Sequence, residues 1–275
     1  MPRYGPTPPN RSNVLFDNLF GEVDRTATLE TISSGISSVI ENAGLLLADA
    51  DVLAQAKRYE RAEFLAATAR EEMGKIYVLV DICRLNFGRH EGLLRGLCKA
   101  FYGHEIKHAY FELSARRYPG ITNLAEMKRA FRNETQRWWP SGYESGEPDM
   151  PHDVYFYREL NLYVDFDNYA KTWSIPKMPA KALIFESEFL GTPVTRAEEV
   201  LKRISATRDI ELFEPDKLEI LNRHFSLQTI DDRTDTHELK RLYQRVGEDL
   251  EREFGLSSDR FEDSEVHNWP LYSFL

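Results

Sequence analysis

Cysteine is scarce in this chain, and the few that occur suggest no special chemistry. The 275 residues contain two cysteines, Cys83 and Cys98, and their separation matches no metal-binding or redox motif. We therefore expect both to be small, buried apolar residues of a protein in a reducing compartment.

Long hydrophobic runs are also missing. No apolar segment approaches the ~20 residues that cross a bilayer, and the first residues, MPRYGPTPPNRSN, lack the apolar core of a signal peptide. The sequence contains no internal repeat and no low-complexity tract. These features predict a cytoplasmic protein with no membrane partner.

The chain has fewer basic than acidic residues, 35 Lys and Arg against 45 Asp and Glu, and the basic residues are unevenly distributed. The formal net charge of −10 argues against a general nucleic-acid coat. Residues 56–117 nevertheless hold 12 Lys and Arg against 8 Asp and Glu. A local cationic patch can bind a phosphate backbone in a salt-dependent way. The alternative is that these residues form ordinary solvated helix faces.

Helical periodicity predicts an all-α fold. Apolar residues at steps of three and four indicate helices over 28–57, 60–84, 93–117 and 123–139, which would form a four-helix core. A polar connector with Pro and Gly follows, including a short extended segment, and helical patterns return over 196–210, 215–225 and 235–254. We predict a tail over 1–27, pinned by Leu15, Phe16 and Phe20, a core domain over 28–180 and a helical extension over 181–275.

The second of these helices carries an unexpected polar group at its centre: Glu71, Glu72, Gly74 and Lys75. Glycine inside a helix costs ~1 kcal/mol relative to alanine, and an exposed Glu–Lys pair returns only ~0.2–0.5 kcal/mol. Gly74 is better explained if another backbone or a ligand approaches the helix closely. The alternative is tight helix packing beside an ordinary surface ion pair.

The third predicted helix carries a matching group, YGHEIKH, in which His104, Lys107 and His108 share a face and Gly103 again lies mid-helix. If the two helices pack side by side, Glu72 and Lys75 meet His104 and Lys107 in one polar cleft. A histidine can act as acid or base, and lysines can stabilise a charged phosphate. The alternative is a pair of half-buried histidines capped by acids.

A metal site fits this group less well. His104 and His108 have the spacing of helical zinc ligands, and Glu105 with His108 forms a Glu-x-x-His unit. Di-iron bundles need two such units, and the core helices offer one. We therefore predict no metal and no cofactor. Arg84 and His90, at the end of the second helix, are a second candidate pair for the same chemistry. An arginine and a histidine at this spacing often occur by chance.

Four stretches together resemble the AbiV family of bacterial abortive infection proteins. They are ENAGLLLADADVL, RYERAEFLAATAREEMGK, FYGHEIKHAY and RELNLYVDFD, which occur in the family's order between Ile40 and Asp167. The resemblance implies a HEPN-like helical bundle, a class that often dimerises and includes metal-independent endoribonucleases. It also implies a role in antiphage defence.

The resemblance assigns functional positions residue by residue. It implies roles for Glu71, Glu72, Gly74 and Lys75, for His104 and Lys107, and for Arg158, Tyr163 and Asp165 in the fourth stretch. In the HEPN ribonuclease pattern an arginine is followed by a polar residue, then by a few more residues and a histidine, leading into a late helix. Arg84 and His90 have the right spacing, although Leu85 follows the arginine.

Three functions remain open from the sequence. In the first, the chain is an RNA-cleaving enzyme in which His104 is the acid or base, Lys75 and Lys107 hold phosphate, and Glu72 orients one of them; a homodimer would widen the RNA groove. In the second, the same cleft binds a nucleotide, a phage protein or the translation machinery without catalysis. In the third, the polar cluster only fixes helix register.

Overall fold

The described part of the computed structural model is predominantly helical, which confirms the all-α fold class. The one pairing of strands is between β1 (Asp165–Asp167) and β2 (Thr172–Ser174), a short antiparallel pair within the described part of the chain. The structure describes residues 10–21, 24–116, 123–135, 165–167, 172–174, 193–228, 230, 234, 236–267 and 270–271.

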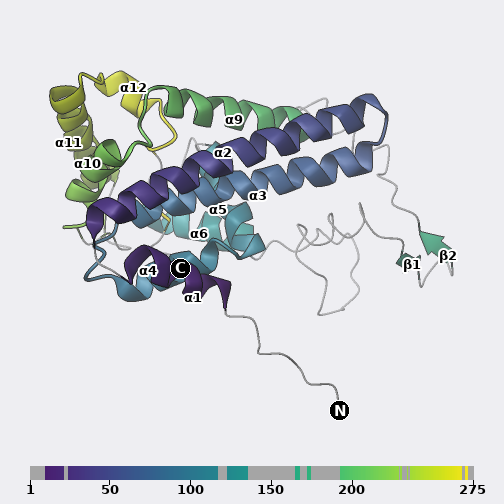
Figure 1. The fold of residues 1–275 in the computed structure, drawn as a ribbon, viewed down its shortest axis with the longest axis horizontal. Helices are drawn as coiled ribbons and strands as arrows, with labels where there is room; N and C mark the ends of the chain where they lie inside the picture. Colours follow the sequence, from purple (N-terminus) through teal and green to yellow (C-terminus); the bar gives the residue numbers. More distant parts are fainter. Residues whose placement is uncertain are drawn as a thin grey trace, which may run out of the picture.

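Two long helices, α2 (Arg25–Gln55) and α3 (Tyr59–Cys83), run antiparallel through the middle of the molecule (Figure 1). The Asp24 side chain caps α2 by accepting a hydrogen bond from the Thr26 N–H at 2.9 Å. Apolar residues from both helices, among them Ile36 and Ile76, are fully buried between them. This pair is the scaffold on which the other helices pack.

Four shorter helices lie below this pair in Figure 1: α1 (Arg11–Phe20), α4 (Glu91–Ala100), α5 (His104–Arg116) and α6 (Leu124–Thr135). Helix α5 packs on α3, α6 packs on α5, and α1 packs on α4. The predicted tail is partly helical, and Phe16, Leu19 and Phe20 bury their side chains in the core.

The predicted single helix over 93–117 is wrong, because the structure has two helices there, α4 and α5. The chain turns at Phe101–Gly103, where the Gly103 N–H donates to the carbonyl oxygens of Lys99 and Ala100. Glycine is a poor helix former, so Gly103 marks the break between the helices rather than the middle of one. His104 is therefore the first residue of α5.

The C-terminal helices are α9 (Pro193–Asp209), α10 (Pro215–Phe225), α11 (Thr236–Phe254) and α12 (Ser258–Glu262). Helices α9 and α10 pack against the α2–α3 pair, α11 packs on α10, and α12 packs on α11. Helix α9 lies along α2 and α3, and α10 to α12 gather at one end of the molecule (Figure 1). Their buried residues continue the apolar core of the other helices. The expected domain boundary at residue 180 lies outside the described residues.

Gly74 allows α3 and α5 to come into backbone contact. A Cβ atom at this position would lie 2.2 Å from the carbonyl oxygen and 2.9 Å from the carbonyl carbon of Lys107. No side chain fits into that space, because the neighbouring atoms belong to the backbone of α5. The mid-helix glycine is thus explained by close helix packing, and the same packing brings the polar ends of Glu71 and Lys107 together.

Replacing Gly74 by alanine should destabilise the protein. The added methyl group must push α5 away, a kind of overpacking that typically costs ~1–3 kcal/mol and outweighs the gain in helix propensity of ~1 kcal/mol. Urea unfolding of Gly74→Ala and of Gly92→Ala measures the difference. The second glycine is the matched control, because a Cβ there meets nothing within 4 Å. Equal or greater stability in Gly74→Ala would contradict the close contact.

Candidate functional site

The centre of the candidate site is a carboxylate shared by an imidazole and an ammonium group. Glu71 projects from α3, and its Oε2 lies 2.6 Å from Nδ1 of His104 and 3.3 Å from Nζ of Lys107, both on α5. Glu71 and Lys107 are buried, whereas the His104 side chain is 37% exposed. A buried carboxylate therefore fixes one edge of an imidazole ring that is partly exposed.

A second polar group adjoins the first on the same side of α3. Glu72 accepts hydrogen bonds from Lys75 Nζ at 2.5 Å and from Asn42 Nδ2 at 3.1 Å. The ammonium group of Lys75 also lies 5.1 Å from the ring centre of Phe101, a cation–π distance. Helices α2, α3 and α5 and the α4–α5 turn thus contribute to one cluster.

This arrangement refines the roles that the sequence suggested. Glu72 does pair with a lysine, but Glu71 is the acid that contacts both His104 and Lys107 directly. Asn42 belongs to the first stretch that resembles the AbiV family, ENAGLLLADADVL, but the sequence assigned it no role. Only the packing of α2 on α3 brings its amide to Glu72.

Charges in the cluster nearly cancel. Glu71 and Glu72 balance the ammonium groups of Lys75 and Lys107. Burial lowers the pKa of Lys107 below its ordinary value, and the positive charge of Lys75 acts in the same direction. The Glu71 carboxylate opposes both effects. An incoming phosphate would therefore meet lysines that already have carboxylate partners.

Arg84 lies in the core and not at this cluster. Its residue is 1% exposed, and its guanidinium group pairs with Asp81, donates to the Tyr243 hydroxyl at 2.8 Å and donates to the Val266 carbonyl at 2.9 Å. It also lies over the ring of Phe225, with a separation of 5.3 Å. These contacts connect the end of α3 to the C-terminal part of the chain.

Asp81 is the acid of this buried network. Its carboxylate accepts hydrogen bonds from the Tyr110 hydroxyl on α5 and from the Leu271 backbone N–H, each at 2.8 Å, in addition to Arg84. Burial raises the pKa of Asp81, and Arg84 and these donors oppose that shift. Sequence reasoning missed Asp81, although an acid inside the apolar run YVLVDIC is a usable signal for a buried charge.

The remaining predicted residues are not part of the cluster. His90 is partly buried after α3, and its Nδ1 accepts a hydrogen bond from the Asn86 backbone N–H at 3.1 Å. This bond closes the turn before α4, while the guanidinium of Arg84 is engaged in the core. Arg158 and Tyr163 lie outside the described residues. Asp165 is described only as backbone, at the start of β1.

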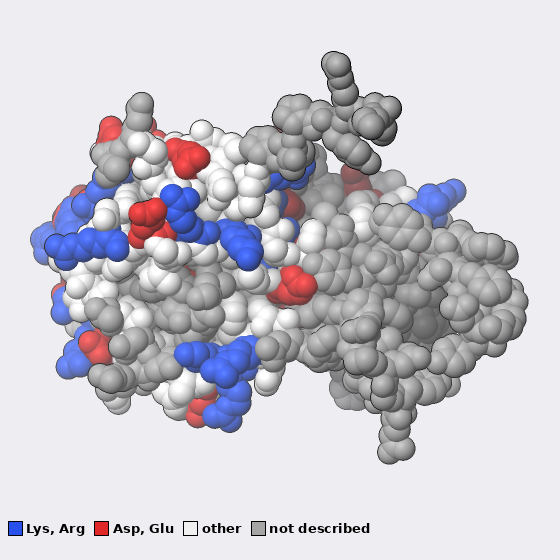
Figure 2. All heavy atoms as spheres, turned by 90° about the horizontal axis from the view of Figure 1, so that it is seen from below, with Lys and Arg blue, Asp and Glu red and all other residues white. Residues whose placement is uncertain are grey.

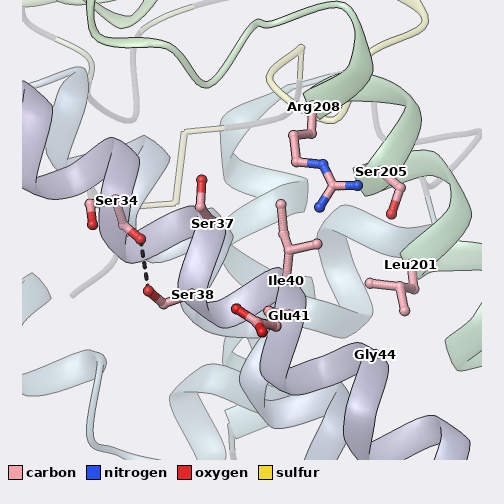
Figure 3. A pocket seen from close by; sticks show the side chains of 9 residues that line it. All are labelled: Ser34, Ser37, Ser38, Ile40, Glu41, Gly44, Leu201, Ser205 and Arg208. Carbon is pink, nitrogen blue, oxygen red and sulfur yellow. Dashed lines mark hydrogen bonds between the residues drawn. The ribbon is translucent and has the colours of Figure 1, made fainter.

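A separate groove of about 590 Å³ lies between α2 and α9 (Figure 3). Serine hydroxyls line it from both helices, and Arg208 reaches over it from α9. The groove is open, and its lining includes one guanidinium, that of Arg208, and one carboxylate, that of Glu41. The residues that line it are Ser34, Ser37, Ser38, Ile40, Glu41, Gly44, Leu201, Ser205 and Arg208.

Surface charge is mixed on the face seen from below in Figure 2. Lys and Arg side chains stand there in several groups, with uncharged residues and some Asp and Glu between them. The part of this face that the structure describes thus carries no single continuous basic stripe.

Within the described ranges, no group of three or more His, Cys, Asp and Glu is placed to hold a metal ion. Similarly, no helix in the described ranges is both long and apolar enough to cross a membrane.

Comparison with known proteins gives one match. The family model HEPN_AbiV, described as AbiV, matches residues 31–187, which is more than half of the chain. The matched region contains α3, α5 and the whole Glu71–His104 cluster, and it ends before α9. Among curated proteins and among solved structures, no significant match was found.

Substitution of Arg84 by methionine should strongly destabilise the fold. It leaves the Asp81 carboxylate buried without its cation, and breaking a buried ion pair in this way costs about 3–5 kcal/mol. Urea unfolding measures the loss. Arg223→Met is the control, because that arginine makes a more exposed ion pair with Glu253 and should lose much less. Equal losses in the two variants would contradict a structural role for the Arg84 network.

Replacement of Glu71 by glutamine should lower the pKa of Lys107 further. The substitution removes the nearest negative charge and leaves burial and the Lys75 charge, both of which favour the neutral amine. An NMR titration of the lysine side chains follows the change. Glu72→Gln is the matched control and should have a smaller effect, since Glu72 influences Lys107 least. An unchanged Lys107 pKa in Glu71→Gln would contradict the geometry of the pair.

Proposed function

Because the chain belongs to the AbiV family of HEPN proteins, we propose that it acts in abortive infection as an endoribonuclease that needs no metal ion. The observation that supports this proposal is the contact of 2.6 Å between the buried Glu71 carboxylate and the partly exposed His104 imidazole. A carboxylate that orients an imidazole is a recurrent way to prepare a general base. We further propose that the protein is cytoplasmic and acts as a homodimer.

Cleavage of RNA at this cluster follows ordinary phosphodiester chemistry. His104 accepts the proton of a ribose 2′-hydroxyl, whose oxygen attacks the adjacent phosphorus atom. The bond from phosphorus to the 5′-oxygen breaks, and that oxygen takes up a proton, so the products carry a 2′,3′-cyclic phosphate and a 5′-hydroxyl. Lys75 and Lys107 stabilise the negative charge that develops on the phosphorus oxygens.

Each carboxylate has a distinct role in this proposal. Glu71 holds His104 and Lys107 in place, whereas Glu72, itself held by Asn42, keeps Lys75 next to the ring of Phe101. When a phosphate enters, it competes with these carboxylates for the two ammonium groups. Preorganised donors of this kind are effective in partly buried sites because water does not screen them fully.

The charge balance of the cluster favours a second candidate function. Both lysines already have carboxylate partners, so the site attracts a bare phosphate less than two unpaired lysines would. A non-catalytic module could instead use Glu71, His104 and Lys75 to recognise a nucleotide, a phage protein or a component of the translation machinery. In that case the cluster is needed for phage protection although no RNA is cut.

Replacement of His104 by alanine should abolish RNA cleavage in the presence of EDTA. Loss of a general base typically lowers the rate about 10²- to 10⁴-fold. Purified protein is incubated with cellular RNA, and the cleaved ends are analysed for cyclic phosphate. His224→Ala is the matched control, since that histidine also contacts a carboxylate, Asp249 at 2.9 Å, but lies on α10.

A phage challenge with the same variants separates the two functions. Cleavage by the wild type and by His224→Ala, but not by His104→Ala, supports the enzyme. Absence of cleavage in every variant, together with loss of protection only in His104→Ala, supports the binding module. Unchanged protection in His104→Ala and in Lys75→Ala would rule out both and leave a scaffold role for the cluster.

A further inference from the structure

Helix α11 presents a row of exposed cations outside the region that matches the family. Its inner face buries Leu239, Leu242, Tyr243, Val246 and Leu250. Its solvent-facing side carries Lys240, Arg241 and Arg245, which are all exposed. Arg241 and Arg245, four residues apart, are neighbours, and Lys240 lies about 100° round the helix axis from Arg241. In the described part of the chain, none of these three side chains takes part in an ion pair. We call Lys240, Arg241 and Arg245 the α11 stripe.

The α11 stripe differs from two other arginines at this end of the molecule, Arg223 and Arg252. Arg223 and Arg252 are paired with Asp249 and Glu253 at the C-terminal part of the same helix. Positive charge is thus neutralised where α11 ends and left without ion-pair partners where it begins. Lys and Arg side chains are visible at this end of the molecule in Figure 2, the end at which Figure 1 places α10 and α11.

Helix stability does not account for this distribution of charge. Residues 236–245 hold three Lys and Arg and one Glu, while residues 246–254 hold four Asp and Glu and one Arg. The helix macrodipole favours the opposite order, with acids first and cations last. Arg241 and Arg245 are like charges four residues apart, and the spacings of Glu238 before Arg241 and Asp249 after Arg245 offset their repulsion. The order of charges along α11 therefore opposes the macrodipole and leaves exposed cations where an external anion can reach them.

The form of the stripe fits an extended polyanion better than a small one. The three cations span about 7.5 Å along the helix axis at a rise of about 1.5 Å per residue, and none is buried in a pocket that would enclose a single anion. The helix is firmly held, because the Tyr243 hydroxyl accepts the hydrogen bond from Arg84 and its ring lies 5.1 Å from that of Phe225. The stripe is therefore a rigid, exposed surface of positive charge on an acidic protein.

We propose that the α11 stripe binds the sugar–phosphate backbone of single-stranded RNA. Arginine and lysine at exposed positions are the residues that contact phosphates without reading sequence. The choice of RNA as the polyanion rests on the proposed function, whereas the binding surface itself is independent of the Glu71–His104 cluster. The C-terminal part of the chain thereby supplies affinity for a substrate that the family-matched part would cut.

The test is the salt dependence of RNA binding by the intact protein. A fluorescent single-stranded RNA without secondary structure is titrated with wild type and with the triple variant Lys240→Gln, Arg241→Gln, Arg245→Gln. Each phosphate contact on a single strand contributes about 0.7 to the slope of log K against log salt. The triple variant should therefore lose about 2 from that slope and bind at least about 10-fold more weakly at low salt.

The matched control removes the same charge from other parts of the surface. Arg11→Gln, Arg129→Gln, Lys202→Gln neutralises three exposed cations that lie on three different helices, α1, α6 and α9, and it should change neither slope nor affinity appreciably. Equal losses in the two triple variants, or no loss in the α11 variant, would overturn the proposal. If RNA binds through the stripe but is never cleaved, the proposed catalysis fails while the α11 stripe remains an RNA-binding surface.

Discussion

The contact between the backbones of α3 and α5 at Gly74 is the constraint on which the candidate site depends. Because no Cβ intervenes, the Lys107 carbonyl can approach α3 closely, and the side chains one turn away on each helix meet. Glu71 then reaches both His104 and Lys107, and Glu72 and Lys75 lie beside them. If α3 and α5 lay further apart, these groups would not meet, because the Glu71 side chain is too short to span the added distance.

A second constraint holds the same helix pair further along. Asp81 on α3 accepts a hydrogen bond from Tyr110 on α5, and it also pairs with Arg84 and binds the Leu271 N–H. These groups are buried, so each would be strongly unfavourable without its partners. The C-terminal segment therefore helps to complete the core around α3, and its helices are packed against the scaffold rather than being a loose appendage.

Function in this family member is divided between two surfaces in our proposals. The Glu71–His104 cluster lies in the region that matches AbiV proteins, is nearly neutral and offers one partly exposed imidazole. The α11 stripe lies beyond that region and carries positive charge without ion-pair partners in the described chain. A neutral site benefits from a separate cationic surface, because long-range attraction of a polyanion needs net positive charge.

The sequence by itself determined the helical class, most helix positions and the polar residues that gather on α3 and α5, because each depends on local periodicity and residue type. Residue type did not decide between a packing and a ligand-binding role for Gly74, nor between a surface and a core position for Arg84. It also placed Gly103 inside one helix, whereas the chain turns there. These points follow from the tertiary structure, because they depend on which backbone or carboxylate from a distant segment lies opposite each residue. Hydrophobic periodicity along the chain does not identify that segment.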